Sequence, residues 1–138
     1  MTPARCRQAR RAPRVLFALA AGCALGAALA APLPPAARAE VDALLNRLQS
    51  SGCEFNRNGS WYAGAEARAH LLKKLDYLEG KGQVQTTEQF IALGASASSM
   101  SGQPYLVRCA GKPAMPSAGW LSSELQQLRT IRAPSAPH

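Results

Sequence analysis

Two separate sets of apolar residues before residue 80 recur with the spacing of one face of an α-helix. The first set lies on one face of a short helix, and its members are Val41, Leu44, Leu45 and Leu48. Glu40 and Asp42 suit the N-terminus of this helix, and Gly52 suits its end because glycine tolerates positive φ. A longer helix is predicted over residues 65–79, with buried positions at Ala67, Leu71, Leu75 and Leu78 and with Leu72 at the margin.

A tight β-hairpin is predicted between these two helices. Asn58-Gly59 favours a type I′ turn, because both central residues of that turn need positive φ. The turn sets the register of the strands, which pairs Arg57 with Ser60, Asn56 with Trp61, and Phe55 with Tyr62. Since side chains alternate across a strand, Cys53, Phe55 and Tyr62 are expected to face the core.

The second half of the chain predicts two more helices and one more strand. Thr86 and Gln89 have the spacing of a capping box and open a short helix. The apolar residues of that helix are Phe90, Ile91 and, as a further candidate, Leu93. Residues 96–102 are rich in serine and are interpreted as a loop, whereas residues 104–109 alternate and favour a strand beside the hairpin.

The last helix follows a turn-rich connection at residues 111–116. Ser117 is expected to cap it, Trp120 lies at its entry, and its apolar stripe comprises Leu121, Leu125, Leu128 and Ile131. Residues 133–138 contain two prolines and are predicted to be disordered. The elements together predict a single α+β domain over residues 40–132, in which about four helices pack on a small antiparallel sheet made of the hairpin and one further strand.

The first 39 residues have the pattern of a cleaved secretory signal peptide. A basic segment with five arginines precedes a low-polarity run at residues 15–31, and Pro32, Pro34 and Pro35 are expected to break any helix. Ala37 and Ala39 supply the small residues at −3 and −1, so cleavage is expected before Glu40. The apolar run is short and alanine-rich for crossing about 30 Å of hydrocarbon. We therefore expect a periplasmic or secreted protein with no membrane span in its mature chain.

An alternative leader would carry a lipid on Cys23, which follows Ala20-Ala21-Gly22. The leucine that such a cleavage box needs lies one position too far upstream, at Leu19. Lipidation of Cys23 would tether the protein to a membrane. The sequence leaves this alternative open.

Removal of the leader changes the charge and the cysteine inventory. The whole chain has 16 basic and 8 acidic residues, and six of the basic residues precede Glu40. A remaining net charge of +2 gives no basic footprint for nucleic acid. Cys53 and Cys109 are the cysteines that remain, and an even pair in an exported chain predicts a disulfide between them. In the chain-entropy model, closing a loop of this length contributes about 4 kcal/mol of stability.

Several motifs are spaced along the chain: Cys53-x-Phe55-x-Arg57-Asn58-Gly59 with Tyr62, Glu66-Ala67, His70-Leu71 with Lys74, Thr86 with Phe90-Ile91, Ser99-x-Ser101-Gly102-x-Pro104-Tyr105-x-Val107, and Ser117-x-x-Trp120-Leu121. Their order and spacing resemble the YfeK-like family of small exported bacterial proteins. The resemblance spans nearly the whole predicted mature chain, which departs from the family pattern at Asn56 and Trp61. It implies an uncharacterised protein, because the family has no known function and no functional residues to carry over.

His70 is the only histidine within the predicted folded region. Glu66 and Lys74 lie one helical turn to either side and would shift the pKa of His70 in opposite directions. His70 could act as a base or contact an anion, but we favour a histidine on the surface. No metal site or other cofactor is expected, because the cysteines are paired and no carboxylate cluster accompanies this histidine. An oxidised cysteine cannot act as a nucleophile, and no G-x-S-x-G elbow is present.

These observations favour a non-enzymatic binding or accessory module of the cell envelope, whose partner would be an unknown envelope protein or polymer. The candidate binding surface comprises Arg57, Trp61, His70, Lys74, Ser101 and Tyr105. Trp61 has two interpretations, as an exposed contact residue or as a side chain packed against a neighbouring helix. The alternative function is a hydrolase of an envelope polymer with His70 as base. That alternative requires a serine hydroxyl or a carboxylate within hydrogen-bond reach of His70.

Overall fold

The computed structural model describes residues 31–133 and has the predicted α+β architecture, with four helices and a four-stranded antiparallel sheet among these residues. The helices are α1 (Pro35–Ser50), α2 (Gly64–Gly80), α3 (Thr87–Gly94) and α4 (Ser117–Arg132). The strands are β1 (Glu54–Arg57), β2 (Ser60–Ala63), β3 (Leu106–Arg108) and β4 (Met115–Pro116).

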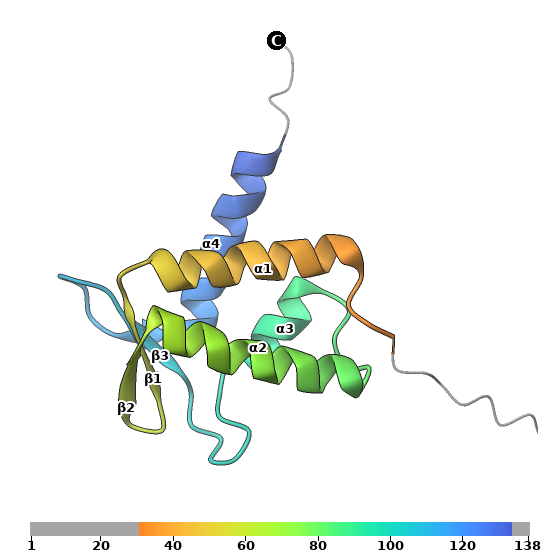
Figure 1. Cartoon of the computed structure of the whole chain (residues 1–138). Helices are drawn as coiled ribbons and strands as arrows, with labels where there is room; N and C mark the ends of the chain where they lie inside the picture. The colour runs from red at the N-terminus through yellow and green to blue at the C-terminus, as the bar shows by residue number, and fades with distance from the viewer. Residues whose placement is uncertain (1–30, 134–138) are drawn as a thin grey trace, which may run out of the picture.

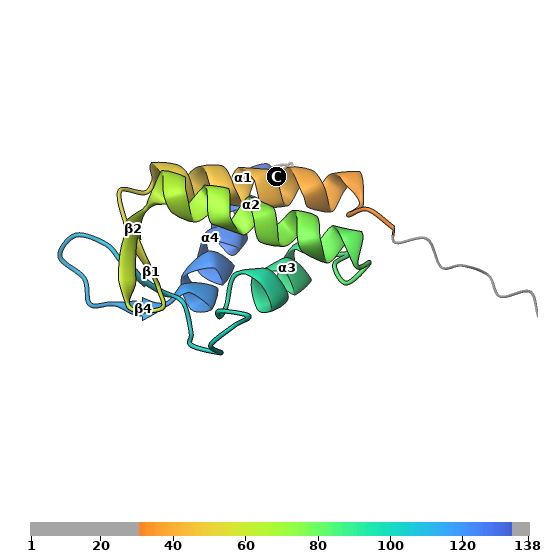
Figure 2. The same cartoon turned by 60° about the horizontal axis from the view of Figure 1, so that its bottom comes forward.

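The helices form two layers, and the sheet lies at one end of them. α1 and α2 run side by side in opposite directions, with α3 and α4 packed beneath them (Figures 1 and 2). α2 starts directly against the end of α1 at Gly64, where a Cβ atom would lie 2.7 Å from the carbonyl oxygen of Leu48. This close approach requires glycine, and it lets the start of α2 pack directly on the backbone at the end of α1.

The hairpin has the register predicted from its turn. Asn58 and Gly59 have φ values of 51° and 85°, and the strand pairs run from Arg57 with Ser60 to Glu54 with Ala63. The strand order is β2-β1-β3-β4, so the predicted third strand lies beside β1. The predicted disulfide between Cys53 and Cys109 is present and joins the start of β1 to the end of β3.

The core lies between the helix layers and the inner face of the sheet. Phe55 on β1 pairs with Tyr62 and Val107 on that face, and its ring meets the ring of Trp120 edge-on at 5.6 Å. The largest fully buried side chains are Phe90, Leu44, Leu45, Leu48, Leu75, Leu121, Val41, Val84 and Val107. Burial of each such side chain contributes about 1.5–3 kcal/mol. Most of these residues lie on the apolar helix faces predicted from periodicity, whereas Val84 lies between α2 and α3 and Val107 lies on β3.

Two element boundaries differ from the sequence prediction. α1 begins at Pro35 instead of near Glu40, because proline at the first helical position has a suitable φ and needs no hydrogen bond from its nitrogen. The prolines therefore do not all break the helix as expected. The connection at residues 111–116 ends in β4, which pairs with β3. That two-residue strand depends on a partner elsewhere in the chain and has no local signal.

Three residues of the predicted helices are also placed differently. The N-cap of α4 is Pro116, and Ser117 makes no capping bond with its side chain. Ser117 is instead buried, and its amide donates to the carbonyl oxygen of Tyr105 at 2.9 Å. Leu93 and Ile131 are exposed, because α3 is short and the last turn of α4 extends beyond the core. Thr86 does cap α3, accepting from the amide of Gln89 at 3.1 Å.

Most of the predicted leader, residues 1–30, and most of the predicted tail, residues 134–138, lie outside the described residues. The predicted cleavage position before Glu40 falls inside α1. The cleavage itself stays a prediction. No helix within residues 31–133 is long and apolar enough to cross a membrane.

Candidate functional site

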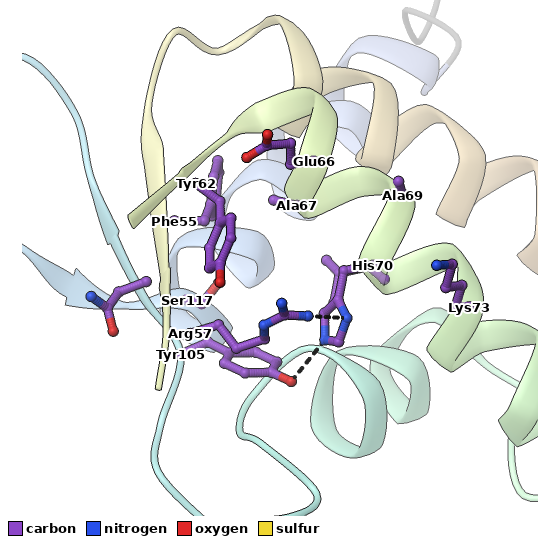
Figure 3. A pocket seen from close by; sticks show the side chains of 12 residues that line it. Phe55, Arg57, Tyr62, Glu66, Ala67, Ala69, His70, Lys73, Tyr105 and Ser117 are labelled. Atoms are coloured by element: carbon purple, nitrogen blue, oxygen red, sulfur yellow. Dashed lines mark hydrogen bonds between the residues drawn. The ribbon is translucent and has the colours of Figure 1, made fainter. Parts of the chain in front are cut away.

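Four of the predicted site residues meet where the hairpin faces α2. Arg57 ends β1, His70 and Lys74 share one face of α2 because they are four residues apart, and Tyr105 precedes β3. Nη1 of Arg57 lies 2.5 Å from Nδ1 of His70, and Nε2 of His70 lies 3.1 Å from the hydroxyl of Tyr105 (Figure 3). Lys74 donates to the same hydroxyl at 3.2 Å and to the carbonyl oxygen of Ala97 at 2.9 Å.

The chemistry of these groups determines the direction of each hydrogen bond. A guanidinium only donates, so Nδ1 of His70 accepts from Arg57 and Nε2 carries the hydrogen. Nε2–H therefore donates to the oxygen of Tyr105, which also accepts from Lys74. Neither neighbour accepts the hydroxyl hydrogen of Tyr105, so that hydrogen can be donated to a ligand.

The site keeps His70 neutral. Its burial, together with the positive charges of Arg57, Lys74 and Lys73, lowers the pKa of His70 to about 4. The predicted opposing effect of Glu66 is not among the causes of this shift, because the groups that act on His70 are all cations. Burial also lowers the pKa of Lys74 and raises the pKa of Tyr105. The cluster is thus two cations bridged by neutral polar groups.

Two cavities meet at this cluster. The first, of about 350 Å³, has a mainly apolar lining that includes Phe55, Ala67 and Leu71. The second, of about 440 Å³, has a more polar lining, with Lys74 and the residues Asn58, Ser60, Ser98, Ser99 and Met100. The residues that line both cavities are Arg57, Tyr62, His70 and Tyr105. These four side chains therefore form the boundary between an apolar and a polar compartment.

The positive charges of Arg57 and Lys74, which both line the polar cavity, have no carboxylate partner among the described residues. Six ion pairs lie within residues 31–133, and neither Arg57 nor Lys74 belongs to any of them. Aspartate and glutamate are absent from the lining of the polar cavity in the described part of the chain. Glu66 lines the apolar cavity only. The polar cavity is therefore suited to a negatively charged group.

Ser101 and Trp61 are not part of this cluster. Ser101 is exposed at the hairpin turn, where its Oγ donates to Oδ1 of Asn58 at 2.6 Å. Trp61 lies on the opposite face of the sheet, and the guanidinium carbon of Arg108 lies 3.9 Å from its ring centroid. Trp61 is half-buried, and the residue that packs on its ring belongs to strand β3. Of the two interpretations left open by the sequence, the contact with a neighbouring helix is replaced by this contact with a strand.

Sequence reasoning missed Tyr62 and Ser98 as residues of this site. Tyr62 was assigned to the core through its pairing with Phe55, and it is only half-buried, with the guanidinium carbon of Arg57 4.9 Å from its ring centroid. The pairing itself could have placed it beside Arg57. Ser98 is buried inside the serine-rich loop, and its Oγ accepts from the amide of Ser101 at 3.3 Å. No local pattern distinguishes it from its neighbours.

No metal centre can be assembled from the described residues, since no three His, Cys, Asp or Glu side chains within residues 31–133 are grouped as ligands.

Comparisons with known proteins give a family and a relative. Residues 35–129 match the model of the Family of unknown function (DUF5329). Uncharacterized protein YfeK from Salmonella typhimurium strain LT2 is 41% identical over 68 residues, which cover 49% of this chain and 55% of that protein. The chain thus spans about half the length of that relative. The predicted resemblance to YfeK-like proteins is confirmed, and no solved structure shows a significant match.

Proposed function

The chain belongs to the DUF5329 family of unknown function, and we propose that it is a non-enzymatic binding module for a small anionic ligand. One observation carries the proposal: Arg57 and Lys74 border the same polar cavity, and its lining contains no carboxylate among the described residues. A partly buried cation without a counter-ion is costly, because it loses hydration without gaining an ion pair. A bound anion would supply the missing partner for both side chains.

The surrounding groups suit an oxyanion. The guanidinium of Arg57 can donate two parallel hydrogen bonds to a carboxylate or phosphate, and Lys74 adds a compact positive charge. The hydroxyl of Tyr105 can donate its hydrogen, because both of its neighbours donate to its oxygen. These donors converge from β1, α2 and the segment before β3. A site assembled from three segments is held by the fold, which reduces the cost of ordering it upon binding.

The alternative hydrolase has less support from the same geometry. A general base needs an available lone pair directed at the proton that it removes. The lone pair of His70 Nδ1 accepts from Arg57, and its Nε2 carries a hydrogen towards Tyr105. Neither partner is a serine hydroxyl or a carboxylate. These contacts favour a role for His70 in positioning Arg57 over a role in hydrolysis.

The location that we propose for this module is the periplasm or the outside of the cell. The disulfide supports this location, because such bonds persist in oxidising compartments. The molecule of the cell envelope that this module binds would then carry an anionic group.

Thermal unfolding with added phosphate or acetate, at constant ionic strength, tests the proposed binding. A ligand that binds only the folded state raises Tm in a saturable manner. We expect this rise in the wild-type protein and in Lys81→Gln, which removes one charge from the far end of α2. We expect Arg57→Gln and Lys74→Gln to lose it. Equal responses in all four proteins, or no response in any, would refute the proposal.

A further inference from the structure

The apolar cavity adjoins the proposed anion site and suggests what else the ligand contains. Phe55 and Leu71 are buried in its wall, Ala67 is half-buried, and the ring of Tyr62 separates it from the polar cavity. Its volume of about 350 Å³ is at the small end of the range for ligand pockets, about 300–1,000 Å³. Filling it with apolar groups is favourable because their contact with water is removed.

One acidic residue limits the charge that such a ligand can carry. Glu66 lines the apolar cavity, and it lies in the first turn of α2. Figure 3 shows Glu66 beyond the ring of Tyr62, at the opposite side from Arg57 and His70. Lys73 also lines this cavity, but Figure 3 shows it beyond His70 and away from Glu66. A second negative group at the far end of a bound molecule, beyond the ring of Tyr62, would therefore lie near the carboxylate of Glu66 and be repelled. The end of the site with Arg57 therefore favours a negatively charged group, and the end with Glu66 favours an uncharged one.

We propose that the ligand is a small monocarboxylic acid, with its carboxylate between Arg57 and Lys74 and its apolar part in the adjoining cavity. This inference rests on the proposed function and adds a ligand class to it. Arg57 reaches both compartments, so a molecule that contacts its guanidinium can extend along Tyr62 towards Leu71.

Calorimetric titration of the protein with acetate, butanoate, hexanoate and adipate tests the ligand class. Each methylene that enters the apolar cavity should raise the affinity about fourfold, as expected for apolar burial. Adipate has the carbon number of hexanoate but a second carboxylate, and it should bind more weakly than hexanoate. Glu66→Gln should improve the binding of adipate by a larger factor than the binding of hexanoate, because only adipate brings a second carboxylate near residue 66.

A second variant distinguishes the cavity from non-specific apolar binding. Ala67→Phe should fill the apolar cavity and remove the gain in affinity from acetate to hexanoate. Ala65→Phe, at an exposed position of the same helix that does not line the cavity, should keep the gain. If acetate and phosphate bind but the chain length has no effect, the ligand class is wrong and the anion site stands. If neither anion binds, the proposed function itself fails.

A separate observation concerns the N-terminal end of the described chain. Leu33 is 4% exposed and belongs to the core. Its amide donates to Oε1 of Glu79 at 3.0 Å, and Nη1 of Arg38 lies 3.0 Å from Oε2 of the same residue. Cleavage before Glu40 would remove both partners of Glu79, one core side chain and the first turn of α1.

We infer from these contacts that the exported protein retains residues 33–39 and that its leader is cleaved before Leu33. Ala28-Leu29-Ala30 supplies small residues at −3 and −1, which would leave Ala31 as the first residue.

The intact mass of the protein exported from the full-length precursor measures this directly. A mature chain that starts at Ala31 is the expected result, and one that starts at Glu40 would overturn the inference. The stability of exported Leu33→Asp gives an independent readout. The substitution should lower Tm if residue 33 is retained, whereas an unchanged Tm would show that the residue has been removed.

Discussion

Two arginines of this fold have opposite surroundings. Arg129 on α4 forms ion pairs with Glu40 on α1, at 2.7 Å, and with Glu88 on α3, at 2.5 Å. Its hydrogen bonds lower the pKa of both carboxyl groups. Arg57 on β1 instead donates to neutral His70 and has no ion pair within residues 31–133.

The difference distinguishes a charge that serves the fold from a charge that is available to a ligand. The cluster of Arg129, Glu40 and Glu88 joins three helices, and its positive charge is already paired with two carboxylates. Burial, together with the positive charges of Arg57, Lys74 and Lys73, lowers the pKa of His70. A bound anion would offset the charges of Arg57 and Lys74, whereas Glu40 and Glu88 already offset that of Arg129.

Among these predictions, removal of the disulfide is expected to have the largest effect on the free energy of unfolding. The bond joins the start of β1, the strand that carries Arg57, to the end of β3. The double variant Cys53→Ala/Cys109→Ala should lose about 4 kcal/mol of unfolding free energy, since the bond closes a separation of 56 residues. Denaturant unfolding measures the loss. An unchanged midpoint in the oxidised and double-variant proteins would show that the sheet does not depend on the bond.

Exchange of the two arginines for glutamine should separate their roles in binding. Arg57→Gln should weaken acetate binding by about tenfold or more, as expected when one charged hydrogen-bonding partner is removed. Arg129→Gln should leave the affinity unchanged and serves as the charge-matched control. Titration calorimetry of both variants at equal ionic strength makes the comparison. An equal loss in both would mean that the net charge of the protein, and no particular site, attracts the anion.

Acid should destabilise the protein first through His70. The pKa of His70 is about 4 in the folded state and near 6.5 when unfolded, so the unfolded chain binds more protons between these values. Stability is therefore complete above about pH 6.5 and falls as the pH decreases towards 4. The loss should be on the order of 1 kcal/mol once solvent screening of this partly exposed group is allowed for.

His70→Asn removes the titrating group and should reduce this loss. Denaturant unfolding at pH 7 and pH 4.5 measures the difference between the two proteins. Glu40 and Glu88, whose pKa values are lowered, titrate at lower pH and are common to both. An identical loss in the two proteins would contradict the assignment to His70.

The smallest effect is expected for the stability of Arg129→Gln. Its ion pairs lie at the surface, where each contributes little, so the loss should be about 0.5–1 kcal/mol. High salt should reduce the difference between the wild-type protein and the variant, because the pairs are screened. A loss as large as that of the disulfide variant would mean that the cluster is part of the core.

The amino-acid sequence determined the elements whose signals are local. Asn58-Gly59 fixed the hairpin and its register because the turn needs positive φ at both positions. Thr86 fixed the start of α3 through one hydrogen bond. The apolar periodicity located the buried faces of α1 and α2, and the two cysteines beyond the predicted leader predicted their bond.

Tertiary structure decided what depends on distant residues. β4 exists only through its pairing with β3, and the extra turn of α1 lies beside Glu79 of α2. His70 and Lys74 share a helix face in the sequence, but Arg57 and Tyr105 reach them only after the sheet has formed. The cavities and the low pKa of His70 follow from that convergence. Burial and the effect of nearby cations depend on which residues are close in three dimensions, which sequence separation alone does not give.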